Sequence, residues 1–181
     1  FMNLTNYYNT LKEKQKEIDK QYFIEKYPLY VDMDGVLTDF KKRFMKYSTL
    51  SPKEYQDQYD KDRFWNLIKK AGVGYWAGMD WMPDGKRLWS FVKHLNPTIL
   101  SAPSREEESK IGKRLWIKRH IPGTKTILTP AFMKKDHAGE NRILIDDTEK
   151  NIADWEAAGG IGILHTDAFS TIAKLKEIGY E

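Results

Sequence analysis

The sequence contains no cysteine among its 181 residues, and this absence excludes several kinds of chemistry. Disulfide bonds, thiolate catalysis and cysteine-ligated zinc sites are all ruled out. No apolar run approaches the roughly 20 residues that a membrane span needs, so we expect no transmembrane segment. Residues 3–20 are polar and unlike a signal peptide, and together with the lack of cysteine this favours a cytoplasmic protein.

Sequence motifs of several common enzyme classes are missing as well. The chain has no glycine-rich P-loop and no GxGxxG, so a kinase or a dinucleotide-binding enzyme has no support. The four histidines form no HxxxH pair, and no Ser-His-Asp arrangement stands out. The net charge of +4 is spread along the chain, and it permits a phosphate-bearing ligand without predicting binding to nucleic acid.

Short apolar runs bounded by turns are the strand candidates. They are Leu29–Val31, Thr98–Leu100, Thr126–Leu128, Ile143–Ile145 and Ile161–Leu164. Helical patterns over residues 85–95, 104–120 and 147–158 separate most of them, and this alternation predicts an α/β fold with a mostly parallel sheet. The middle helix is expected to begin at Ser104, because the residues from there to Glu107 have the form of a capping box.

The remaining segments suggest how the chain is organised. Residues 41–82 contain helical patches, several glycines and many aromatics but no evident strand, so we expect a helical cap inserted after the first strand. Residues 8–26 form an amphipathic pattern, which predicts a helix packed on the core, with an oligomer contact as the alternative. The expected division is an N-terminal helix over 1–27, an α/β core over 28–40 and 83–181, and the cap over 41–82.

Two carboxylates directly follow the first predicted strand. Asp32 and Asp34 are two residues apart, and at that spacing both side chains of a strand point to the same face. Gly35 comes next and would allow a tight turn beside a ligand. Taken alone, the segment could be an ordinary Asp-Gly turn. Ligands of open α/β sheets bind at the carboxyl ends of strands, however, so both acids are candidates for one site.

A second acidic pair, Asp146 and Asp147, ends the strand predicted over 143–145. The alternative is a helix N-cap followed by an acid in the first turn. Four acids held together at two strand ends would repel one another, and a divalent cation removes that cost. Carboxylate and water oxygens are the ligands that Mg²⁺ prefers, so the pattern predicts a Mg²⁺ site that also attracts phosphate.

Two further segments offer groups for an anionic substrate. Ser101 and Ala102 follow a strand just before a predicted helix, where a hydroxyl and free backbone N–H groups can bind phosphate. A plain strand-to-helix turn is the alternative. Lys134 and Lys135 lie upstream of the second acidic pair, and an ammonium there could reach the transferring group. A solvated charge cluster is the alternative for this segment.

These segments, in this order, resemble the four motifs of the haloacid dehalogenase (HAD) superfamily of phosphotransferases. The DxDGVxxD form over residues 32–39 is similar to the first motif, Ser101 to the second, Lys135 or Lys134 to the third, and Asp146-Asp147 to the fourth. The resemblance implies a doubly wound parallel sheet, a HAD-like Rossmannoid core. It also implies a two-step phosphatase mechanism that passes through an aspartyl-phosphate.

The same resemblance implies a role for each acid. Asp32 would be the nucleophile, and Asp34 would be the general acid and then the general base. Mg²⁺ would bind the Asp32 side chain, the backbone carbonyl of Asp34 and Asp146, with Asp147 in the layer behind them. Ser101, Ala102 and the motif lysine would hold the phosphoryl oxygens.

A closer resemblance is to the 5'(3')-deoxyribonucleotidases. It rests on DMDGVLTDF over residues 32–40, FW over 64–65, YW over 75–76, MPDG over 82–85 and LSAP over 100–103. In that family a helical cap closes over the site and aromatics enclose the nucleobase, which implies that Phe40, Phe64, Trp65 and Trp76 contact the base. Aromatics in a small helical subdomain are otherwise core residues.

The expected function is therefore Mg²⁺-dependent hydrolysis of a nucleoside monophosphate. We expect no membrane or nucleic-acid partner, and a homodimer is left open. One alternative keeps the chemistry but acts on another small phosphomonoester or on a 3'-phosphate end of nucleic acid. A second alternative is a non-catalytic phosphate-binding protein on the same fold.

Overall fold

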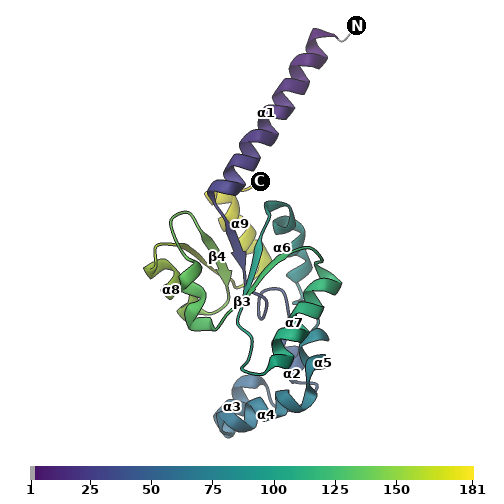
Figure 1. Ribbon diagram of the computed structural model, residues 1–181, viewed down its shortest axis with the longest axis vertical. Coiled ribbons are helices and arrows are strands. Elements are labelled where there is room, and N and C mark those ends of the chain that lie inside the picture. Colours follow the sequence, from purple (N-terminus) through teal and green to yellow (C-terminus); the bar gives the residue numbers. More distant parts are fainter. Residues whose placement is uncertain (1–2) are drawn as a thin grey trace.

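The computed structural model describes residues 3–181 and is built around one parallel sheet (Figure 1). Its strands are β1 (Leu29–Val31), β2 (Thr98–Ser101), β3 (Lys125–Leu128), β4 (Ile143–Asp146) and β5 (Ile161–Leu164). The order across the sheet is β3-β2-β1-β4-β5, so the chain builds outward from β1 on one side and then crosses to build outward on the other. This is the doubly wound α/β fold that the sequence predicts, with its switch point between β1 and β4.

Alternate residues of the strands fill two separate cores, because successive side chains point to opposite faces of a sheet. Ile143 and Ile145 belong to the larger cluster, whereas Leu144 packs with Trp155 in a smaller one. Helices cover both faces. They are α6 (Gly85–Val92), extended by η1 (Lys93–Leu95), then α7 (Glu107–His120), α8 (Glu149–Ala157) and α9 (Ala168–Ile178).

Several helix limits differ from those predicted. Helix α7 begins at Glu107 and not at Ser104, and its N-cap is Glu106, which makes no side-chain capping bond. The backbone N–H of Ser104 instead donates to the hydroxyl of Ser109, which holds Ser104 in the loop. Helix α8 begins at Glu149, because Asp146 ends β4 and the loop after it carries Asp147.

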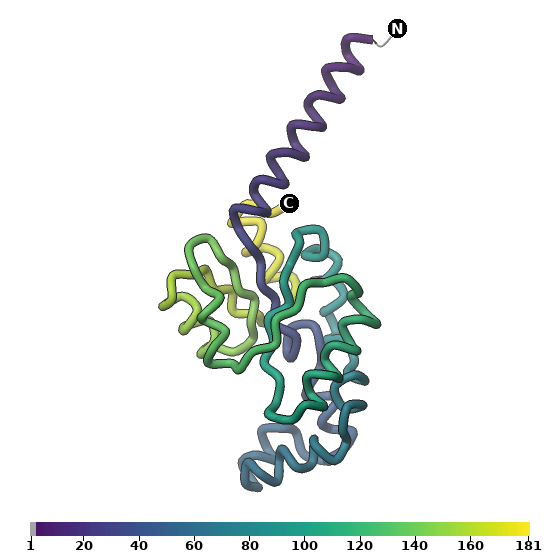
Figure 2. Tube along the Cα trace, viewed as in Figure 1, coloured from purple at the N-terminus to yellow at the C-terminus, as the bar shows by residue number. Residues whose placement is uncertain are grey.

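The segment predicted to be a helical cap contains four short helices. They are α2 (Phe40–Phe44), α3 (Pro52–Gln58), α4 (Lys61–Ala71) and α5 (Val73–Ala77). Helix α5 packs closely on α7, where a Cβ at Gly112 would lie 2.5 Å from the Cβ of Trp76. The indole of Trp116 on α7 donates to the carbonyl of Met79 at 2.9 Å. These helices lie at one end of the molecule in Figures 1 and 2, and we propose that they form a cap over the core.

Helix α1 (Leu4–Lys26) projects from the opposite end of the molecule (Figure 2). The expectation that this helix packs on the core is wrong for most of its length. Only its last turn touches the body, through buried Ile24 and half-buried Phe23. The apolar face predicted along the helix is too thin, and too far from the sheet, to be covered by it. Across residues 3–181, every helix is too short or too polar to cross a membrane.

Candidate active site

The turn after β1 presents Asp32 and Asp34. The backbone N–H of Asp32 donates to Ile145 of β4 at 2.9 Å, which carries the ladder one residue past the strand. Gly35 then takes a left-handed φ of 81°, and the carbonyl of Met33 accepts from three following N–H groups. The Thr38 hydroxyl donates to Oδ1 of Asp34 at 2.9 Å. Asp32 is thus buried and Asp34 half-buried at the carboxyl end of the central strand.

The end of β4 presents the second acidic pair beside the first. Asp146 is fully buried, and its carboxylate accepts from the backbone N–H of Thr148 at 2.9 Å and from the Asn151 amide. Asp147 lies against Gly35, where an added Cβ would come within 2.0 Å of Oδ2 of Asp147. A glycine is therefore required at residue 35 both by its φ and by this close approach.

Three of these carboxylates form a group that could hold a cation. Oxygens of Asp32, Asp146 and Asp147 lie within 4.8 Å of one another. Burial, together with the neighbouring Asp146 charge, raises the pKa of Asp32 to about 7 and that of Asp147 to about 6. Hard oxygen donors crowded at this spacing suit Mg²⁺, which relieves their mutual repulsion, so the residues fit the expected metal.

Lys134, and not its neighbour, reaches this group. Its ammonium lies 3.0 Å from Oδ1 of Asp32 and 2.7 Å from Oδ2 of Asp146, and the side chain is buried on η2 (Ala131–His137). Burial alone would lower the pKa of Lys134, but the two carboxylates outweigh it and the pKa is raised. Lys135 is exposed. Of the two lysines left open by the sequence, the structure brings only Lys134 to the acids.

A second buried lysine, Lys113, was not predicted to be in the site. It lies on α7 with 1% of its surface exposed, and its ammonium is 2.6 Å from Oδ2 of Asp34 and 3.0 Å from Oγ of Ser101. It also lies 5.1 Å from the centre of the Trp76 ring. The sequence did contain a sign of this role. Lys113 shares the apolar face of a helix with Trp116 and Ile117, and a buried lysine without a charged partner would cost stability.

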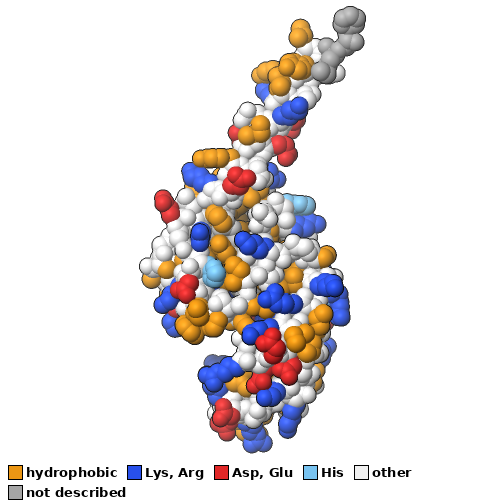
Figure 3. Space-filling model, in the orientation of Figure 1, with side chains coloured by type: hydrophobic (Ala, Val, Ile, Leu, Met, Phe, Trp, Pro, Cys, Tyr) orange, Lys and Arg blue, Asp and Glu red, His pale blue; other side chains and the backbone are white. Residues whose placement is uncertain are grey.

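An open cavity of about 620 Å³ lies over the acids. Its walls come from the turn after β1, the loops after β2 and β4, η2 and both ends of the cap. They include Asp32, Asp34, Phe40, Ala102 and Lys134. Ser101 is buried and accepts its hydrogen bond from Lys113. Figure 3 shows the surface hollowed between the body and the cap helices.

The cap aromatics differ in how far they reach this cavity. Phe40 lines it. Phe64 and Trp76 are 2% and 4% exposed and belong to the larger buried core, where Phe64 stacks on Phe44 at 4.9 Å. Trp65 is half-buried against the same core and is not among the residues that line the cavity. The structure therefore brings one of the four predicted base contacts to the site.

Comparison with known proteins agrees with these motifs. No protein-family model matches the chain. A protein of Vibrio phage KVP40 named "Putative 5'(3')-deoxyribonucleotidase" is 30% identical over 146 residues, which span 79% of each chain.

Two solved structures are more distant. A hydrolase from Streptococcus pneumoniae TIGR4 is 13% identical, with a TM-score of 0.48 over 84% of this chain and 98% of its own. A hydrolase from Pseudomonas syringae is 14% identical, with a TM-score of 0.44 over 84% of this chain and 99% of its own.

Proposed function

The chain belongs to the 5'(3')-deoxyribonucleotidase family of HAD phosphatases and is a phosphoric monoester hydrolase, and from that premise we propose that it hydrolyses nucleoside monophosphates at the cavity over Asp32. The observation that carries the proposal is the convergence of Asp32, Asp34, Asp146 and Asp147 with two buried lysines at the switch point of the sheet. Phosphoryl transfer depends mainly on positioning and on neutralising charge, and this group supplies both.

Asp32 is the proposed nucleophile. One carboxylate oxygen forms a bond to phosphorus as the bond from phosphorus to the leaving oxygen breaks, which gives an aspartyl-phosphate. Lys134 holds Oδ1 of Asp32 at 3.0 Å and thereby directs the other oxygen. Its positive charge also favours the ionised carboxylate, against the burial that raises the pKa of Asp32.

Asp34 is the proposed acid and base. It gives a proton to the leaving oxygen in the first step. In the second step it takes a proton from the water that attacks phosphorus, as the bond between phosphorus and Asp32 breaks and frees phosphate and the Asp32 carboxylate. Both of its oxygens are held, Oδ1 by the Thr38 hydroxyl and Oδ2 by Lys113. These two bonds fix the direction in which the carboxyl group faces the cavity.

Mg²⁺ is the proposed cofactor. Asp32, Asp146 and the Asp34 carbonyl would hold it, and Asp147 would lie behind them. When bound, it would neutralise charge that develops on the phosphoryl oxygens. Lys134 and the backbone around Ala102 would hold the same oxygens from the chain itself. Phe40 is the aromatic placed to lie against a nucleobase, because it lines the cavity at the start of the cap.

A panel of phosphate-release assays tests this proposal. Deoxyribonucleoside 5'- and 3'-monophosphates, ribonucleotides, sugar phosphates and 3'-phosphorylated oligonucleotides would be compared with Mg²⁺ and with a chelator. We expect release from the deoxyribonucleotides with Mg²⁺ and little release after chelation. Equal or faster release from sugar phosphates or oligonucleotides would overturn the substrate class, and no release from any phosphomonoester would overturn the enzymatic function.

A further inference from the structure

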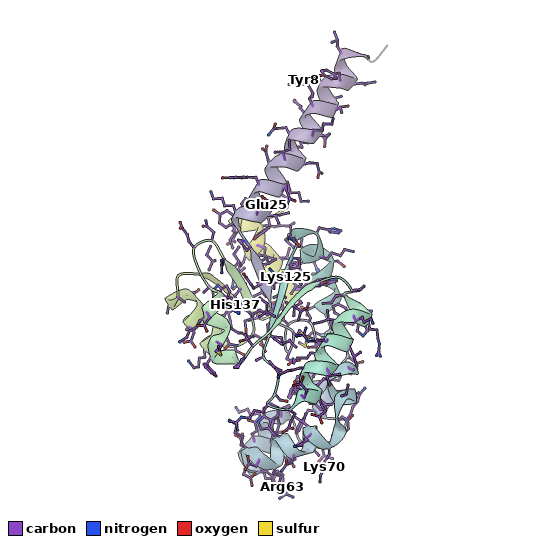
Figure 4. All side chains as sticks on the ribbon, in the orientation of Figure 1. Tyr8, Glu25, Arg63, Lys70, Lys125 and His137 are labelled. Carbon is purple, nitrogen blue, oxygen red and sulfur yellow. The ribbon has the colours of Figure 1, made fainter. Side chains whose placement is uncertain are left out.

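Helix α1 carries large apolar side chains that the body of the described chain does not cover. From Leu4 to Tyr22 every side chain is exposed, and the helix extends about 35 Å at 1.5 Å per residue. Large apolar side chains at regular intervals stand in solvent: Leu4, Tyr7, Tyr8, Leu11, Ile18 and Tyr22. Figure 4 shows Tyr8 far from the body on this projecting helix. Most of the stability of helices in proteins comes from packing an apolar face, so we expect this face of α1 to have a surface to pack against.

The apolar side chains of α1 follow the heptad spacing of a coiled coil. The seam residues are Leu4, Tyr8, Leu11, Gln15, Ile18 and Tyr22, with intervals that alternate between four and three residues. In the notation abcdefg, Tyr8, Gln15 and Tyr22 take position a, and Leu4, Leu11 and Ile18 take position d. A polar Asn or Lys at a single a position is a known means of specifying register, at a cost in stability, and the polar Gln15 takes such a position here.

The contact between α1 and the body leaves this seam free. Phe23 and Ile24, which pack on the body, take positions b and c, on the side of the helix opposite to a and d. At the same turn Tyr22, in the seam, is 67% exposed. The groove between α1 and the C-terminal residues is also lined mostly from the b, c and f positions, among them Glu13, Lys16 and Lys20. A partner helix could therefore follow the seam down to the body.

Charges beside the seam point to the identity of the partner. In a parallel, in-register pair of helices, a g residue meets the e residue five positions later on the other chain. Lys14 takes position g and Asp19 takes position e, so each would face its opposite charge on a second copy, twice by symmetry. The other such pairs, from Tyr7 to Lys12 and from Gln21 to Lys26, bring no like charges together.

We propose that α1 pairs with α1 of a second copy of this chain as a parallel two-stranded coiled coil. Dimerisation would leave both candidate active sites open, because α1 leads into the start of β1 and Asp32 follows the other end of that strand (Figure 1). The pairing does not depend on the catalytic role proposed above, and it is tested without any measurement of activity.

Sedimentation equilibrium of the full chain over a range of concentrations is the first test. We expect a dimer whose dissociation constant rises at least about a hundredfold in the double variant Leu11→Glu, Ile18→Glu, since buried aliphatic side chains are worth tenfold or more each. The matched control is Asn9→Glu with Thr10→Glu, which adds the same charge at positions b and c and should dimerise normally. If the unaltered chain were a monomer at all concentrations, the proposal would be overturned. An equal rise in the dissociation constant of both double variants would also overturn it.

The absence of cysteine makes a second test possible. A single Gln15→Cys substitution should form an intermolecular disulfide on mild oxidation, because a positions face each other in a parallel pair, whereas Asn9→Cys should not. Lys14→Asp and Asp19→Lys should each weaken the dimer, and mixing the two variants should restore it. A dimer that does not cross-link through residue 15 would overturn the parallel arrangement.

Discussion

The ammonium of Lys113 lies 2.6 Å from Oδ2 of Asp34, although 79 residues separate the two in the chain. Thr38 holds the other oxygen of the same carboxylate at 2.9 Å. The candidate acid and base is thus held from its own turn and from helix α7. Lys113 also contacts Ser101 at 3.0 Å, so one buried charge joins the first and second motifs.

Replacing Lys113 by methionine should lower kcat by about a hundredfold or more, the usual contribution of a positioned acid and base. The reason is that methionine cannot donate to Oδ2 of Asp34, so the carboxyl group loses the partner that orients it. Lys110→Met is the matched control, because Lys110 lies on the same helix and pairs only with exposed Glu107 in the described chain. Steady-state phosphate release measures both variants. Equal rates for the two would show that Lys113 has no part in positioning Asp34.

Lys134→Met should abolish most activity, with a loss of at least about a hundredfold in kcat/KM, because the charge that faces Asp32 and the phosphoryl group disappears. Lys135→Met should leave the rate within about twofold, since Lys135 is exposed. The same assay compares the two neighbours directly. A larger loss from Lys135→Met than from Lys134→Met would contradict the assignment of Lys134 to the active site.

The affinity for Mg²⁺ should increase with pH. The pKa of Asp32 is raised to about 7 and that of Asp147 to about 6, so below those values each carboxyl holds a proton that the cation must displace. Apparent affinity should fall by up to about tenfold per pH unit for each displaced proton and level off above about pH 8. Isothermal titration calorimetry in buffers of different ionisation enthalpy counts these protons. An affinity independent of pH would contradict the assignment.

The raised pKa values of Asp32 and Asp147 also determine how the stability of the metal-free protein depends on pH. A carboxyl whose pKa is higher in the folded chain than in the unfolded chain adds stability that is complete below the unfolded value and is lost as the pH rises through the folded value. The metal-free protein should therefore lose stability between about pH 4 and 7, and Mg²⁺ should reduce that loss. Thermal unfolding across this range, with and without Mg²⁺, measures the effect.

Gly35→Ala should cost about 1–2 kcal/mol of unfolding free energy from the left-handed φ of 81° alone. It should also weaken Mg²⁺ binding, because the new Cβ would displace Asp147. Gly74→Ala is the control, since its Cβ would meet nothing within 4 Å. Urea unfolding and calorimetry measure both effects. Normal stability and metal binding in Gly35→Ala would contradict the geometry of the turn.

The strands and the acids at their ends could be predicted from the sequence because their signals are local. Leu29–Val31 and Ile161–Leu164 have the predicted limits, since each is an apolar run bounded by turn residues. Asp32 and Asp146 could be placed together because the parallel strands before them end at the same edge of the sheet.

The contributions of distant packing could not be predicted. Lys134 and Lys135 are neighbours with the same chemistry, and only the fold of η2 decides which one turns inward. Phe64 and Trp76 are buried in the cap, because aromatic composition does not distinguish a core residue from a cavity wall. The projection of α1 could not be predicted for a similar reason, since an apolar stripe does not reveal whether the chain itself or another molecule covers it.

Asp32 as the nucleophile is the central step of the proposed mechanism. Phosphate release from a deoxyribonucleoside 5'-monophosphate, with Mg²⁺ present, should be compared between the unaltered chain and Asp32→Asn, which keeps the size of the side chain. We expect a loss of at least about a thousandfold, because the amide cannot form the bond to phosphorus that the carboxylate forms. A rate in Asp32→Asn close to that of the unaltered chain would contradict it.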